Sequence, residues 1–376
     1  MRNLSEVRMI IQGALEGKPQ KVKNYALALA DKLEKEGDQK GGKQILQILE
    51  QIQLQKLQPM EVSSQILPVD SESRLPLIES RFFTEEESFL VLEDIPMKII
   101  NEFIDLTEHS DLLIREDIAI PRSLLLYGPP GTGKSQTAKY ISYKLDLPLI
   151  TARIDALVSS FLGSTSKNIR TLFDFVDNTP CIFFLDEFDA IAKLRDDKNE
   201  LGELKRVVNS LLQNIDSLKG KIPIIAATNH EHLLDSAVWR RFDYKVKIPL
   251  PRKNERYLLF KHFLFPIITE TNQVELLSYL SKGFSGSDIS TLSNRIKTKK
   301  ILGRISEINE KVIFDLYIEF LRSGVRNNEE DTTVLRTEII RKLYKEHSKV
   351  FPQRRLAEIY GCSLGKMSKL LKEGST

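Results

Sequence analysis

Residues that commonly form structural cross-links are scarce in this chain of 376 residues. It has only two cysteines, Cys181 and Cys362, which lie far apart in unrelated contexts, and its five histidines show no metal-ligand spacing. The composition therefore predicts neither a disulfide framework nor a zinc site, and it fits a reducing compartment. We expect a cytoplasmic location.

Long apolar runs are also absent. No stretch approaches the roughly 20 apolar residues of a membrane-spanning helix, and the first residues lack the apolar core of a signal peptide. The net charge of +3 is too small to indicate nucleic acid or a membrane surface as a partner. The composition, 41% apolar and 28% charged, is ordinary for a globular protein, and we expect no membrane partner.

The most informative segment that is present follows the apolar run 123–127 and precedes a helical pattern over 136–145, which begins at Gln136. It matches the G-x-x-x-x-G-K-[ST] pattern of a phosphate-binding loop in the strand–loop–helix context that this pattern needs. Glycines allow backbone N–H groups to surround phosphate oxygens, and the helix start adds partial positive charge. The lysine is expected to contact the β- and γ-phosphates, and the serine hydroxyl to ligate Mg²⁺. The residues are Gly128, Pro129, Pro130, Gly131, Thr132, Gly133, Lys134 and Ser135.

A second motif places two acids after the apolar run 181–185. Asp186 and Glu187 then lie at the carboxyl end of a buried strand, where ligands of open α/β sheets bind. Asp186 is expected to hold Mg²⁺, directly or through water, and Glu187 to polarise the attacking water. The run 224–228 ends similarly at Asn229, which is expected to contact that water or the γ-phosphate. The alternative for Asn229 is a turn cap.

The pattern of apolar runs divides the chain into five parts. Residues 1–56 are helical in pattern, either a three-helix unit or amphipathic helices docked on the next domain, and 57–85 read as a proline-containing linker. Residues 86–250 alternate strand-like runs with helical patterns, which predicts a three-layer α/β domain with a mostly parallel sheet. Residues 251–325 and 333–376 are helical in pattern.

The order of these motifs resembles the AAA family within the AAA+ ATPases over roughly residues 86–325. The resemblance implies a P-loop α/β/α ATPase domain with a helical lid, an ATP and Mg²⁺ requirement, and the roles given above for Lys134, Ser135, Asp186, Glu187 and Asn229. It also implies an arginine that reaches a neighbouring subunit. Arg241, directly before Phe242 and Asp243, matches this position. Arg240 is a candidate second finger, with a solvated arginine pair as the alternative. Such a finger implies a homo-oligomeric ring, most often a hexamer.

Two further segments match the family. Phe161, Leu162 and Gly163 correspond to a pore loop that grips a polypeptide, although packing of Phe161 into the core stays an alternative. The second pore loop is expected near 195–202. The segment 283–289 resembles the turn that begins a lid helix over the adenine, with Gly286 near the nucleotide. Ser285 and Asp288 have the spacing of a helix cap.

The last part has the spacing of a helix-turn-helix over 356–371, with Gly361 in the turn and Ser363 as the expected N-cap. Its second helix would expose Lys366, Ser368, Lys369 and Lys372 to DNA, and the segment from Pro352 onward has a net charge of +3. A small bundle used for protein contacts or for closing the ring is the alternative. We expect DNA as a partner only if the first interpretation holds.

Two classes of function follow. One is a protein-remodelling ATPase with a protein substrate, and the chain has no HExxH or GxSxG protease motif, which leaves room for a separate protease partner. Its layout is similar to small bacterial AAA ATPases encoded beside subtilisin-like proteases in plasmid-maintenance or phage-defence pairs. The other is an ATP-driven DNA-associated factor, such as a loader or transposition-type regulator.

Overall fold

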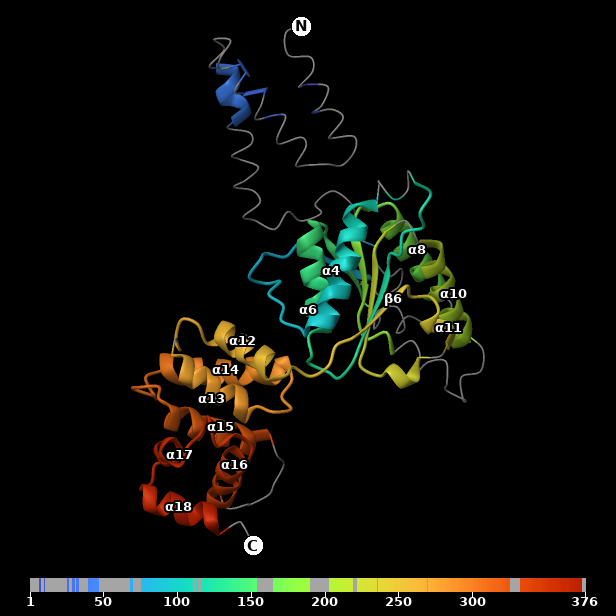
Figure 1. The fold of residues 1–376 in the computed structure, drawn as a ribbon. Helices are drawn as coiled ribbons and strands as arrows, with labels where there is room; N and C mark the ends of the chain where they lie inside the picture. The colour runs from blue at the N-terminus through green and yellow to red at the C-terminus, as the bar shows by residue number, and fades with distance from the viewer. Residues whose placement is uncertain are drawn as a thin grey trace. The chain divides into compact units, whose positions relative to one another are not determined.

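The computed structural model (Figure 1) describes part of the chain before residue 47 and most of it from residue 76 onward. The described positions before residue 47 are helical; the rest of 1–56, and both expected pore loops, Phe161–Gly163 and 195–202, lie outside the described residues. Met1–Ile66 and Ser80–Phe82 form one compact unit, and the other residues form a second. The described ranges are 68–69, 76–110, 113, 116–153, 165–189, 203–218, 222–234, 236–268, 270–324 and 332–373, with 7, 10, 26, 29–30, 32–33 and 40–46.

A six-stranded sheet forms the centre of the larger unit, in the order β1-β3-β4-β5-β2-β6. The pairs β3–β4, β4–β5, β5–β2 and β2–β6 are all parallel. Every residue of β4 and β5 is buried, because helices cover both faces of such a sheet. The strands are β1 (Ile78–Arg81), β2 (Ser123–Tyr127), β3 (Leu149–Ala152), β4 (Ile182–Leu185), β5 (Ile224–Thr228) and β6 (Tyr244–Lys247).

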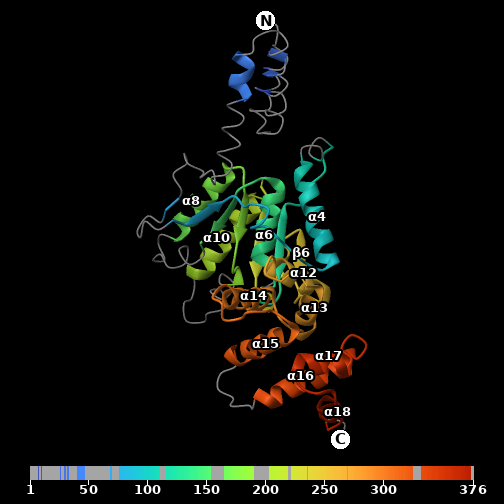
Figure 2. The same cartoon turned by 90° about the vertical axis from the view of Figure 1, so that its left-hand side faces the viewer.

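Helices cover both faces of this sheet (Figures 1 and 2). Alternate residues of a strand point to opposite faces. Leu124 and Leu126 of β2 accordingly join one hydrophobic cluster with α4 (Asp94–Glu108) and α6 (Lys134–Leu145). Leu125 joins another cluster with α8 (Thr165–Asp177) and α10 (Glu203–Leu218). The predicted three-layer α/β/α architecture is confirmed.

Strand β1 lies inside the segment that the sequence predicted as a linker. Its start is fixed by the hydrogen bond from Arg153 N–H to the carbonyl of Leu77, and Val69 pairs with Pro76 in an isolated antiparallel bridge. Proline cannot donate to a sheet but is tolerated at the start of an edge strand, and Pro76 lies two residues before Ile78. Because of the prolines in this segment, the sequence pattern indicated a linker where the structure has an edge strand.

Helices follow the sheet, as the pattern after residue 250 predicted. The first four are α12 (Lys253–Leu264), α13 (Thr271–Leu280), α14 (Gly286–Ile301) and α15 (Glu310–Gly324). The last three are α16 (Thr332–His347), α17 (Gln353–Tyr360) and α18 (Leu364–Lys372). One hydrophobic cluster runs through all seven helices, from Phe260 of α12 to Met367 of α18. The last three helices therefore share the core of the first four.

Candidate functional site

The loop between β2 and α6 has a backbone that only glycine adopts easily. Gly128, Gly131 and Gly133 have φ values of +143°, +72° and +107°. A Cβ on Gly128 would stand 2.3 Å from the carbonyl oxygen of Ile248, and one on Gly131 would stand 2.7 Å from the Ser285 hydroxyl. The loop is thus a cradle that leaves no room for a side chain at Gly128 or Gly131, as a phosphate-binding backbone requires.

Lys134 begins α6 and is almost fully buried. Its ammonium group donates to the carbonyl oxygens of Gly128 and Pro129, at 2.9 and 2.7 Å. Burial lowers the pKa of Lys134, and the charges of Asp186 and Asp189 oppose that shift. The loop therefore encloses Lys134, and the two nearby carboxylates favour its protonated form.

The phosphate-binding loop and the acidic motif meet at the carboxyl ends of β2 and β4. The Ser135 hydroxyl donates to a carboxylate oxygen of Asp186 at 2.8 Å. Glu187 is exposed next to it, and its backbone N–H donates to the other Asp186 oxygen at 2.9 Å. Glu187 also has a φ of +51°, a conformation that is uncommon outside glycine and that often marks functional positions.

A third carboxylate belongs to this cluster, and sequence reasoning missed it. Asp189 is buried and accepts a hydrogen bond from the Thr228 hydroxyl at 3.1 Å. Its other oxygen lies 4.0 Å from Nε2 of His230. Thr228 is the last residue of β5, directly before the half-buried Asn229. Residues 186–188 form a turn with a left-handed φ at Glu187, so no helical spacing could have placed Asp189 in this cluster.

The segment with the two arginines is anchored to the sheet. The Asp243 carboxylate accepts from the Ser123 hydroxyl at 2.6 Å, and Phe242 is buried edge-on against Phe188. Arg240 is exposed. Arg241 donates to the Asp216 carboxylate at 3.0 Å and to the Ala237 carbonyl at 2.8 Å. Neither of these partners belongs to the phosphate-binding loop.

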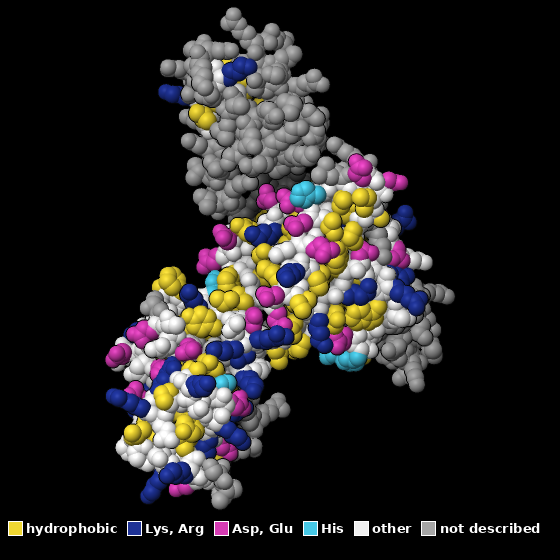
Figure 3. Space-filling view, viewed as in Figure 1, with side chains coloured by type: hydrophobic (Ala, Val, Ile, Leu, Met, Phe, Trp, Pro, Cys, Tyr) yellow, Lys and Arg dark blue, Asp and Glu magenta, His cyan; other side chains and the backbone are white. Residues whose placement is uncertain are grey.

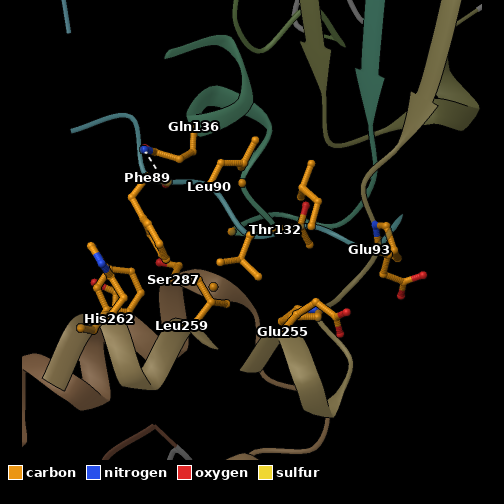
Figure 4. Close-up of a pocket in the computed structure, with 18 of the residues that line it drawn as sticks. Phe89, Leu90, Glu93, Thr132, Gln136, Glu255, Leu259, His262 and Ser287 are labelled. Carbon is orange, nitrogen blue, oxygen red and sulfur yellow. Dashed lines mark hydrogen bonds between the residues drawn. The ribbon is translucent and has the colours of Figure 1, made fainter. Parts of the chain in front are cut away.

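A pocket of about 360 Å³ opens beside the loop (Figure 4). Its walls come from 86–93, from the loop and α6, and from α12 and α14. The Gln136 amide donates to the carbonyls of Glu87 and Phe89, which attaches the segment 86–93 to α6. The Phe89 ring stacks on His262 with centroids 3.5 Å apart, and burial is the main reason that the pKa of His262 is lowered. A flat aromatic wall next to a phosphate cradle suits a nucleotide base.

The start of α14 closes this pocket from the helical side. The Ser287 N–H donates to the Gly131 carbonyl at 3.1 Å, and a Cβ on Gly286 would stand 3.2 Å from the same oxygen. Ser285 and Asp288 form the predicted capping box. Gly286 thus lies against the Gly131 carbonyl, and the predicted helix cap is present; the contact of Gly286 with the nucleotide stays a prediction.

Comparisons with known proteins agree with this geometry. Residues 124–250 match the family model described as "ATPase family associated with various cellular activities (AAA)". The chain is similar to a proteasome-activating nucleotidase of Saccharolobus islandicus, with 32% identity over 66% of this chain and 70% of the relative. This chain belongs to the AAA family. An uncharacterised AAA family ATPase of Sinorhizobium fredii is 34% identical over 59% of this chain and 67% of its own length.

A third relative matches a shorter part of this chain. The Arabidopsis thaliana protein named SUPPRESSOR OF K(+) TRANSPORT GROWTH DEFECT 1 is 38% identical over 45% of this chain and 40% of its own length. As an AAA family member, the chain binds nucleotide and hydrolyses ATP. Among the described residues, no helix is long and apolar enough to span a bilayer.

Proposed function

We propose that this AAA ATPase forms a ring that remodels or unfolds a protein substrate through central pore loops. The observation that carries the ATPase part of the proposal is the 2.8 Å hydrogen bond between Ser135 and Asp186, beside the buried Lys134. It brings the phosphate-binding and acidic motifs into one site. The similarity to proteasome-activating nucleotidases, which continues beyond the loop and the acids, supports a protein substrate.

Each residue of the site has a proposed role. Lys134 and the loop N–H groups of 128–135 bind the β- and γ-phosphates, Glu187 polarises the attacking water, and Asn229 orients it. The 86–93 segment and Gly286 enclose the base. These roles suit the observed positions, because Glu187 is exposed beside the loop while Lys134 is enclosed by it.

Ser135 and Asp186 would hold Mg²⁺. A hydroxyl and a carboxylate are hard oxygen donors, which Mg²⁺ prefers. The described residues contain no cluster of three His, Cys, Asp or Glu that could hold a metal, but Mg²⁺ at such sites relies on phosphate and water for its other ligands. When bound, the ion neutralises charge that develops on the phosphates.

Arg241 is proposed to act on the nucleotide of an adjacent protomer. In its own chain it binds Asp216 and Ala237, neither of which is a loop residue, and this supports a role toward a neighbour. A head-to-tail ring, as a hexamer, satisfies that geometry. Arg240 is a proposed second finger. Phe161, Leu162 and Gly163 are the proposed grip on the polypeptide, and a separate protease is the proposed recipient.

Replacing the proposed catalytic acid tests the ATPase assignment. Glu187→Gln should retain ATP binding and lower hydrolysis by about 10²- to 10⁴-fold, because only the group that activates water is changed. Glu108→Gln, at the exposed end of α4, is the matched control. ATP affinity and steady-state turnover are the measurements. Turnover at the parent rate in Glu187→Gln would remove Glu187 from the chemistry.

Stimulation of turnover separates the two classes of function. A remodeller should hydrolyse ATP faster when an unfolded protein is added, and Phe161→Ala should abolish this response while basal hydrolysis persists. A DNA-associated factor, the second candidate, would instead respond to duplex DNA and not to unfolded protein. A response to duplex alone would replace the remodelling proposal.

A further inference from the structure

The strongest feature outside the ATPase site is an uneven distribution of charge. Residues 332–373 contain ten Lys and Arg against four Glu, a net charge of +6, whereas the whole chain has +3 and the remainder is therefore −3. Such asymmetry indicates a polyanionic partner. Figure 3 shows Lys and Arg side chains on the part of the view that α16–α18 occupy in Figure 1.

The arginines of this region support its fold. Arg336 pairs with Asp315, Arg341 donates to the Leu370 carbonyl at 2.8 Å, and Arg355 donates to Glu310 at 2.6 Å. Arg354 pairs with Glu358 on the surface of α17. These four cations are thus engaged with protein groups, so the excess charge that is available to a partner comes from the lysines.

The lysines of α18 behave differently. Lys366, Lys369 and Lys372 are exposed and spaced three residues apart, which places them on one side of the helix. Among the residues that the structure describes, no acidic side chain forms an ion pair with any of them. Met367 is buried on the opposite side and joins the hydrophobic cluster. Helix α18 therefore turns a basic face outward.

The turn between α17 and α18 has the glycine and the serine cap that the helix-turn-helix spacing predicted. Gly361, with a φ of +80°, ends α17, and the Ser363 hydroxyl caps the start of α18. The first turn of α18 is open: Leu364 is 53% exposed, and a Cβ on Gly365 would meet no atom within 4 Å. In helix-turn-helix proteins the N-terminal residues of the second helix contact base edges, and flanking lysines contact phosphates.

We propose that the exposed face of α18, with Lys366, Lys369 and Lys372, binds duplex DNA. The lysines contact phosphates, and the open first turn enters the major groove, where Leu364 offers an apolar contact to a thymine methyl group. A surface used for an acidic protein would also need the lysines, but it would not explain the exposed, capped first turn.

Binding of a short fluorescein-labelled duplex of mixed sequence to the full chain tests this proposal. The parent should bind, with affinity that falls steeply as salt is raised. Lys366→Glu/Lys369→Glu should weaken binding at least tenfold, and Lys366→Gln/Lys369→Gln should reduce the slope of log affinity against log salt by about 2, one for each lost phosphate contact. Lys98→Glu/Lys144→Glu, at exposed positions on α4 and α6, is the matched control.

Three outcomes would overturn the proposal. The first is no duplex binding by the parent at about 50 mM salt. The second is equal weakening by the α18 and control pairs, which would indicate unspecific attraction to the whole chain. The third is lysine-dependent binding of poly-glutamate without duplex binding, which would assign the face to an acidic protein. Thermal unfolding of each variant verifies that the fold is intact.

Discussion

The phosphate-binding loop depends on single glycines, because a residue with a side chain could adopt their backbone conformations only with strain. Gly128 is the clearest case, because it combines a φ of +143° with the Ile248 carbonyl 2.3 Å from where a Cβ would lie. Glu187 has an unfavourable φ despite its side chain, at a cost on the order of 1–3 kcal/mol. The backbone strain at Glu187 thus lowers the stability of the fold at the residue that is proposed to activate water.

Adding one methyl group to Gly128 should therefore be costly. Gly128→Ala should lower the free energy of unfolding by roughly 2 kcal/mol or more, through backbone strain and the clash with Ile248, and should weaken ATP binding. Gly365→Ala is the matched control: the site is open, and alanine favours a helix by up to about 1 kcal/mol. Urea unfolding and nucleotide titration measure both variants. A Gly128→Ala protein as stable as its parent would contradict the observed backbone.

The two cysteines should differ sharply in reactivity. Burial raises the pKa of Cys181 to about 12, whereas Cys362 is partly exposed, and the thiolate is the reactive form. Iodoacetamide near neutral pH should therefore modify Cys362 in the folded protein and spare Cys181 until unfolding. Mass spectrometry of the labelled peptides locates the modification.

The same burial predicts a pH dependence of stability. The folded state keeps the Cys181 proton at pH values where the unfolded state has lost it, so this contribution to stability is complete below the ordinary thiol pKa and declines as pH rises toward 12. Cys181→Ala should weaken that alkaline decline. In the iodoacetamide experiment, equal modification of Cys181 and Cys362 in the native protein would contradict the buried position of Cys181.

At the scale of elements, the strands could be predicted where apolar runs were continuous. The runs that became β2, β4 and β5 are buried on both faces, which leaves an unbroken apolar signature. Strand β1 lacked it, since an edge strand is short and here follows Pro76. The segment 86–93 and Asp189 were missed for another reason. Their contributions to the site come from contacts with α6, α12 and β5 that no local pattern encodes.

Arg355 joins α17 to α15, and the neighbouring Arg354 serves as a control. Arg355 is about one-fifth exposed; it binds Glu310 at 2.6 Å, lies 3.6 Å from Glu275 of α13, and covers the Phe351 ring. Arg355→Met should lower the free energy of unfolding by roughly 1–3 kcal/mol, because two half-buried carboxylates lose their partner. Arg354→Met, whose ion pair is exposed, should cost less than about 1 kcal/mol. Urea unfolding of both variants is the measurement, and equal losses would show that Arg355 does not join these helices.

At the scale of the whole molecule, the proposed ring requires each subunit to complete the site of another. Arg241→Ala should bind ATP without turnover, and Lys134→Ala should fail to bind ATP. Mixed, the two should recover part of the activity, since a Lys134→Ala subunit can offer its intact Arg241 to a neighbour that binds ATP. Turnover measured across mixing ratios tests this, and the absence of recovery at every ratio would exclude a finger acting between subunits.

The hydrophobic cluster shared by α12–α18 connects α18 with the helices that line the nucleotide pocket. Met367 of α18 and Phe260 of α12 belong to one continuous core, and Ser287 of α14 grips the loop at Gly131. Packed side chains therefore connect α18 with the helices that line the nucleotide pocket, so a partner that holds α18 fixed would also restrain those helices.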